Sequence, residues 1–210
     1  LHGSSAASDV YKRQVPGEKE NLGNGVAYCP HCDGPFFKGK DVAVVGGGNS
    51  GIEAALDLSG IVNKVTVLEF MSDLKADNIL VEKAKEKQNI DILTNVDTSQ
   101  ILSNSGKVSG LEYIERDSSE KKIVDLEGIF VQIGLVPNSQ FLKGTVNLND
   151  FGEIIVNHLG ETSEEGIYAC GDVTTIPYKQ IIISMGEGAK TALSVSDYLM
   201  KSDDFSIIPN

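Results

Sequence analysis

The sequence predicts an α/β protein built around a Rossmann-like strand–helix–strand unit that carries an antiparallel β-meander. Three observations lead to this fold class. An apolar strand over residues 42–45 runs directly into the glycine pattern Gly46-x-Gly48-x-x-Gly51. Short β-branched segments then alternate with segments of helical periodicity. Beyond residue 93 the rhythm changes to strands separated by polar turns, as in a meander.

The strand–helix–strand unit follows from local patterns. Apolar residues recur at helical spacing over 49–59, and the short β-branched segment 64–69 is predicted to be the next strand. Such crossovers pair their strands in parallel. Asp77 is expected to cap a helix over 78–87, and a third strand is predicted over 90–93.

The meander is predicted from strands over 108–115, 122–126 and 129–133. After it come two short predicted strands over 153–156 and 167–169, and then one long helix over 180–200. This last section holds no complete strand–helix–strand unit, so it is expected to be part of a domain. The predicted organisation is a foreign or disordered leader over 1–14, a linker over 15–25, the glycine-turn domain over 26–138, a C-terminal segment over 139–203 and a tail over 204–210.

Composition limits the classes of function. The 210 residues are 40% hydrophobic and 23% charged, which is typical of a globular protein. A net charge of -12 repels phosphate backbones and argues against nucleic-acid binding. Three cysteines argue against a secreted disulfide scaffold and favour the cytoplasm, where a disulfide is catalytic. No apolar run reaches the length of a transmembrane helix.

The glycine pattern predicts a dinucleotide site because its context is complete. Gly46 permits the tight turn, Gly48 lets the backbone approach a pyrophosphate, and Gly51 lets the helix pack against the strand. Glu69 closes the next strand, where an acid that binds the ribose hydroxyls is expected. Its carboxylate would repel the extra phosphate of NADP, and no Arg follows it, so we expect NADH to be preferred. The alternative is a glycine-rich turn without a ligand.

Cys29 and Cys32 form a Cys-x-x-Cys pair shortly before the glycine turn. This spacing allows a redox-active disulfide across one turn. Zinc binding and unreactive structural cysteines are the alternatives, but a zinc site usually needs four ligands, and the remaining His and Cys residues have no ligand spacing. Asp33 is either a turn residue or a proton donor to a thiolate. Cys170, in an apolar strand, is expected to be a small buried hydrophobe.

With these motifs assembled, the chain resembles the low-molecular-weight thioredoxin reductase family, class II of the pyridine nucleotide-disulfide oxidoreductases. Within that family it looks closest to the alkyl hydroperoxide reductase branch. The resemblance covers residues 15–199. The segments that carry it are Tyr28–Phe36, Val45–Leu56, Val65–Phe70, Gly128–Asn138 and Cys170–Ile181 together with Gly186-Glu-Gly188.

The resemblance implies a disulfide reductase that passes electrons from NADH through FAD to the Cys29–Cys32 disulfide. It implies that Cys32 faces the flavin, that Cys29 is the interchange thiol, and that Asp33 handles the thiolate proton. The acceptor would be a thioredoxin-like domain serving a peroxiredoxin, and the intact protein would be a homodimer.

The resemblance also implies cofactor contacts. Asn49, Ser50 and Gly134 lie in the segments quoted above and are expected to contribute. The C-terminal segment would be the last part of a Rossmann-like FAD-binding domain. The expected flavin contacts there are Gly171, Asp172, Lys179, Gln180 and Ile181. The family's N-terminal FAD-binding half, with its own glycine fingerprint, has no counterpart in these residues, so we expect an incomplete FAD site and little activity from this chain alone.

Three other functions stay open at this point. The first is a thioredoxin reductase; the resemblance implies that its NADPH-using members carry arginines where this chain has Glu69, which matches the NADH-using branch. A non-catalytic NAD-binding module would keep the glycine turn without a working thiol pair. A zinc-stabilised interaction domain is a third reading, which metal analysis would separate from the others.

Overall fold

The computed structural model describes residues 8–10 and 15–201, and its chain divides into two compact units. One unit, the glycine-turn domain, spans Val10–Gly134. The other, the C-terminal unit, comprises Leu135–Asn210 together with the first nine residues. Of the predicted leader, Ser8–Val10 forms strand β1, which pairs with β10 (Leu135–Pro137). The predicted tail over 204–210 lies outside the described residues.

The glycine-turn domain is organised on a five-stranded sheet with the order β2-β9-β3-β4-β5, all parallel. The helices that connect its strands are α2 (Asn49–Ser59) and α3 (Asn78–Lys85), close to the predicted bounds. The strands are β2 (Val26–Ala27), β3 (Asp41–Val45), β4 (Lys64–Leu68), β5 (Ile90–Leu93) and β9 (Gly128–Val131).

The antiparallel meander consists of β6 (Val96–Asn104), β7 (Lys107–Glu115) and β8 (Lys121–Asp125). The prediction that residues 129–133 form its third strand was wrong, because this segment is β9 of the parallel sheet. All four residues of β9 are buried, as expected for a strand covered on both faces. The strand that sequence reasoning missed is β6, whose polar residues hide its alternation.

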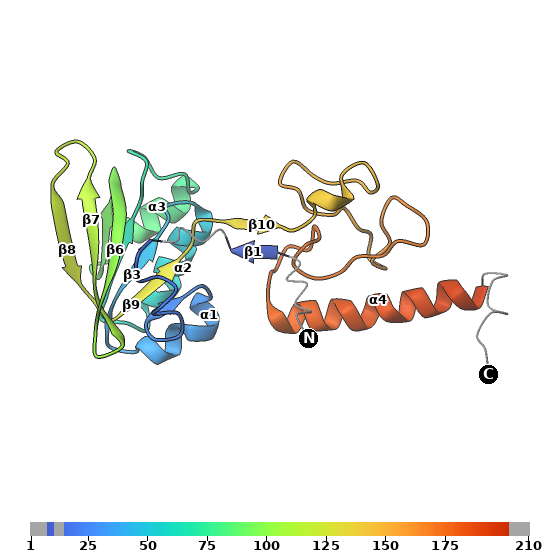
Figure 1. Ribbon diagram of the computed structural model, residues 1–210, viewed down its shortest axis with the longest axis horizontal. Helices are drawn as coiled ribbons and strands as arrows, with labels where there is room; N and C mark the ends of the chain where they lie inside the picture. Colours follow the sequence, from blue (N-terminus) through green and yellow to red (C-terminus); the bar gives the residue numbers. More distant parts are fainter. Residues whose placement is uncertain (1–7, 11–14, 202–210) are drawn as a thin grey trace. The chain divides into compact units, whose positions relative to one another are not determined.

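The meander covers one face of the parallel sheet, and α2 and α3 cover the other (Figure 1). Alternate residues of β3 belong to the two opposite cores. Val42 and Val44 belong to the core shared with α2 and α3, whereas Ala43 and Val45 belong to the core shared with the meander. These side chains are almost fully buried. Each contributes on the order of 1–3 kcal/mol of hydrophobic stabilisation. The ends of these rigid strands therefore position the residues that follow them.

Residues 15–25, expected to be a linker, instead pack onto the glycine-turn domain. Glu18 is only 3% exposed and Asn21 is also buried. The carbonyl of Pro16 accepts a hydrogen bond from the backbone N–H of Ile101 in β6. The polar residues that suggested a linker instead form turns and hydrogen bonds, and some of them are buried.

The C-terminal unit has little regular structure before its long helix α4 (Ile181–Lys201). A short 3-10 helix, η2 (Gln140–Leu142), opens it. The two strands predicted over 153–156 and 167–169 are only isolated bridges, including Ile154 with Thr174. Glycines at positive φ turn the chain every few residues and prevent longer strands: Gly144, Gly152, Gly160, Gly166 and Gly171. Within the part of the chain that the structure describes, no helix has both the length and the apolar character needed to cross a membrane.

Candidate functional site

The two predicted cysteines form a disulfide at the start of the short helix α1 (Pro30–Asp33), which leads into the 3-10 helix η1 (Gly34–Phe37). Cys29 is the N-cap residue, and its Sγ accepts a hydrogen bond from the Cys32 N–H at 3.2 Å. The fixed φ of Pro30 suits the first helical position. After reduction, the same N–H would stabilise negative charge on the Cys29 sulfur. Cys29 is half-buried, whereas Cys32 is exposed.

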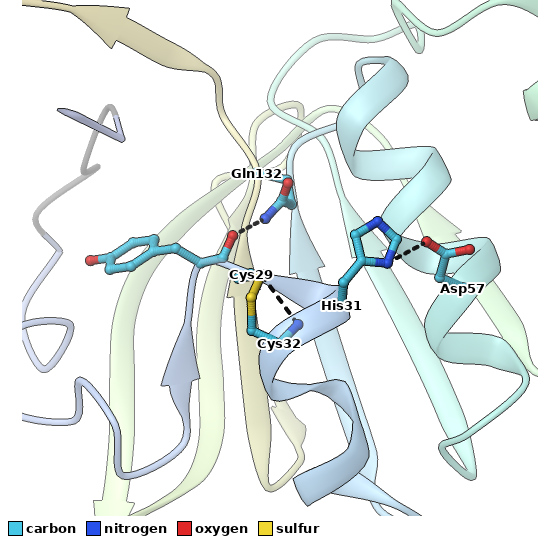
Figure 2. The surroundings of a disulfide bond; sticks show 6 residues. Cys29, His31, Cys32, Asp57 and Gln132 are labelled. Carbon is cyan, nitrogen blue, oxygen red and sulfur yellow. Dashed lines mark hydrogen bonds and ion pairs between the residues drawn. A yellow bond between two sulfur atoms is a disulfide. The ribbon is translucent and has the colours of Figure 1, made fainter. Parts of the chain in front are cut away.

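Gln132 is a residue that sequence reasoning missed, and it joins the redox segment to the glycine turn. Its side-chain Nε2 donates to the Tyr28 carbonyl at 2.8 Å, directly before Cys29 (Figure 2). Its backbone N–H donates to the Val45 carbonyl at 2.8 Å, and its own carbonyl packs against Gly46. No local motif marks this glutamine, because its partner lies 104 residues earlier.

Asp33 and Cys29 line one cavity of about 370 Å³. Aromatic side chains, including Phe36, form much of the remaining wall. The structure therefore brings the predicted acid and the predicted interchange thiol to the same cavity. On the other side, His31 between the cysteines faces Asp57 of α2, with Nδ1 to Oδ2 at 3.4 Å (Figure 2). Both side chains are more than half exposed, so this pair contributes at most about 1 kcal/mol.

The glycine turn between β3 and α2 has the geometry that its sequence predicts. Gly46 has φ 121°, and a Cβ there would lie 2.3 Å from the Gln132 carbonyl oxygen. A Cβ on Gly51 would lie 1.9 Å from the Gly46 carbonyl oxygen. A Cβ on Gly48 would meet nothing within 4 Å. Gly46 and Gly51 are thus required by close packing, whereas Gly48 borders open space.

The start of α2 offers free backbone donors. Its N-cap is Gly48, which has no side chain to cap the first N–H groups. Such uncapped N–H groups, aligned with the helix dipole, form a binding site for phosphate. Ser50 is exposed at this helix start. Asn49 instead bonds Asp77 in both directions, at 3.0 and 2.7 Å. Asp77 is the N-cap of α3 as predicted, but its carboxylate makes no capping bond.

Glu69 follows β4 and lies over the glycine turn. Its Oε2 accepts a hydrogen bond from the Gly47 N–H at 2.5 Å, and its Oε1 accepts one from the Met71 N–H at 2.7 Å. The carboxylate is therefore held at the edge of the sheet where the adenosine ribose of a dinucleotide binds in Rossmann folds. Arg116 also lies near this residue, which the local sequence around Glu69 does not reveal.

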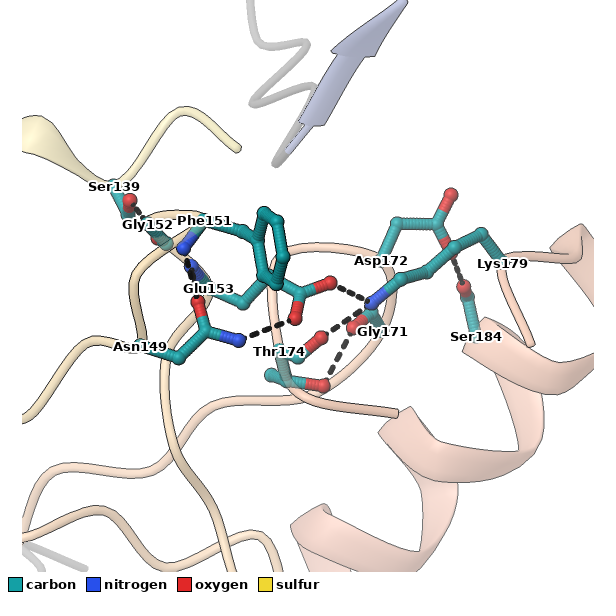
Figure 3. A network of polar contacts seen from close by, with 10 residues as sticks. All are labelled: Ser139, Asn149, Phe151, Gly152, Glu153, Gly171, Asp172, Thr174, Lys179 and Ser184. Carbon is teal, nitrogen blue, oxygen red and sulfur yellow. Dashed lines mark hydrogen bonds and ion pairs between the residues drawn. The ribbon is translucent and has the colours of Figure 1, made fainter. Parts of the chain in front are cut away.

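In the C-terminal unit, Gly171 and Asp172 form a turn beside α4 (Figure 3). The Gly171 carbonyl accepts hydrogen bonds from Thr174, and Asp172 Oδ1 accepts one from the Ser184 hydroxyl at 2.6 Å. Gln180 precedes α4, and Ile181, its first residue, is 78% exposed. Gly134 has φ 112° and open space around it.

Lys179, predicted to lie beside a flavin, is half-buried in the C-terminal unit and pairs with an acid there. Its Nζ lies 2.8 Å from a Glu153 carboxylate oxygen and donates to the Thr174 carbonyl at 2.5 Å. The two side chains are 17% and 22% exposed. In this structure the ammonium thus has a structural role.

We expect Lys179→Ala to lower the free energy of unfolding by about 1–3 kcal/mol, because the half-buried Glu153 carboxylate loses its cationic partner and keeps, among the described residues, only the hydrogen bond from Asn149 Nδ2. Urea unfolding of the 210-residue chain measures this change. Lys190→Ala is the matched control, since Lys190 pairs with Glu187 on the surface of α4 and its loss should cost less than about 0.5 kcal/mol. Equal effects of the two variants would contradict the structural role of Lys179.

Two further predictions concern the remaining cysteine and metal binding. Cys170, expected to be buried, is a half-buried free thiol. No group of three or more His, Cys, Asp or Glu side chains that could hold a metal ion occurs among residues 8–10 and 15–201.

Comparisons with known proteins show which family this chain resembles. Residues 3–194 match the family model described as pyridine nucleotide-disulphide oxidoreductase. Over 188 residues the chain is 57% identical to the F subunit of alkyl hydroperoxide reductase from Pseudomonas putida, a match that covers 90% of this chain and 36% of that protein. Over a match of the same length it is 56% identical to a protein named NADH dehydrogenase in Bacillus subtilis, covering 90% of this chain and 37% of that one.

Among solved structures, thioredoxin reductase from Streptococcus pyogenes superposes with a TM-score of 0.88 at 32% identity. That match covers 93% of this chain and 64% of the other. Thioredoxin reductase from Giardia duodenalis gives a TM-score of 0.86 at 26% identity, covering 92% of this chain and 64% of the other. The chain spans little more than a third of the length of the two relatives named above.

Proposed function

The chain belongs to the pyridine nucleotide-disulphide oxidoreductase family, and from this premise we propose that it is the NADH-binding and dithiol-bearing part of a flavin-dependent disulfide reductase. The observation that carries the proposal is the pairing of two sites in one domain. The Cys29–Cys32 disulfide and the Gly46–Gly51 turn are joined through the backbone and the side-chain amide of Gln132.

The proposed chemistry at the sulfurs is thiol–disulfide exchange. The Cys29 thiolate attacks the acceptor disulfide and forms a mixed disulfide, releasing one acceptor sulfur as a thiolate. The Cys32 thiolate then attacks Cys29 Sγ, which restores the intramolecular disulfide and releases the second acceptor sulfur. Two electrons leave the pair, and the two thiol protons end on the acceptor. Asp33, which shares the cavity of Cys29, would transfer the proton at this thiolate.

The residues present fit the two cofactors that the family implies. For NADH, the open space at Gly48 and the uncapped start of α2 would hold the pyrophosphate, and Glu69 would accept from the ribose hydroxyls. For FAD, Gly171, Asp172 and the first turn of α4 are the candidate contacts. When bound, NADH and FAD supply the electrons that reduce the Cys29–Cys32 disulfide.

The acceptor we propose is a thioredoxin-like domain that serves a peroxiredoxin, in a cytoplasmic homodimer. The support is the similarity to the F subunit of alkyl hydroperoxide reductase. A thioredoxin reductase is the second candidate, favoured by the superposition on the Streptococcus pyogenes enzyme. The two candidates share all the residues discussed above and differ in the acceptor disulfide.

Thiol titration tests the dithiol proposal against a zinc or structural role. The oxidised 210-residue chain should show one reactive thiol, from Cys170, and three after reduction and removal of the reductant. Exposure to a disulfide acceptor should return the count to one, with one acceptor disulfide reduced per chain. A count of three before reduction, or stoichiometric zinc, would show that the pair is not a redox disulfide.

We expect the 210-residue chain to bind NADH but little FAD, because the candidate flavin contacts among the described residues are limited to Gly171, Asp172 and the first turn of α4. Purified protein should be nearly colourless after incubation with FAD and desalting, and NADH should not be consumed when an acceptor disulfide is added. The exposed Ile181, Ile182 and Met185 at the start of α4 favour aggregation of such a chain. A yellow preparation with sustained NADH consumption would contradict this expectation.

A further inference from the structure

Arg116 provides a positive charge close to the segment that follows Glu69. Its Nη1 donates to the Phe70 carbonyl at 3.1 Å and to the Asn95 Oδ1 at 3.1 Å. Its guanidinium carbon lies 4.0 Å from the centre of the Phe70 ring. Phe70 directly follows Glu69, so the arginine contacts the chain immediately beyond the predicted ribose-binding acid.

Backbone hydrogen bonds among the residues that follow β4, β5 and β7 hold Arg116 close to Glu69. The Val96 N–H donates to the Glu69 carbonyl at 3.1 Å, and the Asn95 N–H donates to the Met71 carbonyl at 2.8 Å. The Arg116 N–H in turn donates to the Asn95 carbonyl at 3.0 Å. Asn95 adopts φ 58°, a conformation that asparagine tolerates better than most residues. Backbone bonds thus hold the base of the arginine relative to Glu69.

The guanidinium keeps most of its donors available. A guanidinium has five N–H donors in a planar fork, and the two side-chain bonds of Arg116 both use Nη1. Arg116 is exposed and forms no ion pair with any carboxylate of the described residues, including Glu69. An exposed arginine that is not paired with a carboxylate can bind an anionic ligand, even in a chain with a net charge of -12.

We propose that Arg116 is a specificity-determining residue. Its guanidinium binds the 2′-phosphate of NADPH when the Glu69 carboxylate is removed. In the wild-type chain, Glu69 alone therefore excludes NADPH. This inference rests on the proposed NADH-binding function. The planar fork of arginine binds phosphate through paired, charge-assisted hydrogen bonds. A carboxylate at Glu69 repels the same phosphate. The preference for NADH over NADPH is therefore set by one acid, Glu69, although Arg116 beside it could bind the phosphate.

A double-mutant cycle measured by calorimetry tests the proposal on the 210-residue chain, with NADH and NADPH as the ligands. We expect Glu69→Ala to raise the affinity for NADPH about tenfold over wild type. Adding Arg116→Ala to that variant should remove most of the gain. Arg116→Ala alone should change the affinity for NADH less than about twofold, because NADH carries no 2′-phosphate.

Two further variants distinguish a specific effect of Glu69 and Arg116 from a general effect of charge or from misfolding. Glu69→Gln removes the charge but keeps one acceptor oxygen, which can bind one of the two neighbouring N–H groups, and this variant should also gain NADPH affinity. Lys107→Ala removes the same charge from the opposite end of β7, about 30 Å away by strand length and beyond the screening distance. This control should leave the NADPH affinity of the Glu69→Ala variant unchanged.

The outcomes separate this inference from the proposed function. Wild type that binds no NADH overturns the proposed function and this inference with it. Wild type that binds NADH, with a Glu69→Ala variant whose NADPH affinity is unchanged or does not depend on Arg116, overturns this inference alone.

Discussion

Gly51→Ala should lower the free energy of unfolding by about 3 kcal/mol or more, as judged by urea unfolding of the chain. The new Cβ would lie 1.9 Å from the Gly46 carbonyl oxygen, and the atoms nearest to it are all backbone atoms of Gly46, so no flexible side chain can move aside. The helix α2 would have to move away from β3, and the core that Ile52 and Leu58 form against the sheet would open.

Gly48→Ala is the matched control, because a Cβ there meets no atom and φ is -82°. We expect a loss of at most about 1 kcal/mol, the ordinary difference between Gly and Ala at an N-cap. Affinity for NADH should nevertheless fall, since the methyl group occupies the space where the pyrophosphate would approach. Unfolding of the two variants at the same urea concentration would contradict the packing argument.

Cys32→Ser should convert the chain into a trap for its acceptor. After reduction, Cys29 attacks the acceptor disulfide, but no neighbouring thiol resolves the mixed disulfide. A covalent adduct that a reductant cleaves should then accumulate with a thioredoxin-like protein in its disulfide form. Non-reducing electrophoresis and mass spectrometry detect it.

Cys29→Ser is the companion variant, and it tests which sulfur attacks first. Exposure alone would favour Cys32 as the attacking thiol. The hydrogen bond from the Cys32 N–H to Cys29 Sγ favours negative charge on Cys29 instead. We therefore expect the adduct to form on the order of 10²-fold more slowly with Cys29→Ser. Faster trapping by Cys29→Ser would reverse the roles of the two sulfurs.

The sequence was sufficient for the parts of the fold that depend on local pattern. The helix over 49–59 has the predicted bounds, because the glycine turn starts it and Gly60 ends it. The assignment of β9 failed because its position in the sheet depends on pairing with β2 and β3, which are far away in the sequence. The strand β6 was missed because polar residues interrupt its apolar face.

The candidate site divides in the same way. Cys29, Cys32 and the glycines were found from spacing, because their geometry is set within a few residues. Gln132 could not be found, since its partner Tyr28 lies 104 residues earlier. Arg116 contacts Phe70 from 46 residues further along the chain, so the residues directly after Glu69 do not indicate it.

The central claim is that the Gly46–Gly51 turn holds NADH in the domain that carries the dithiol. An NMR titration of the isotope-labelled chain with NADH tests it most directly. We predict saturable shifts of the Gly47, Gly48 and Asn49 amide signals, with NADPH causing smaller shifts at equal concentration. Unchanged signals at these three amides, with NADH bound elsewhere or not at all, would contradict the account.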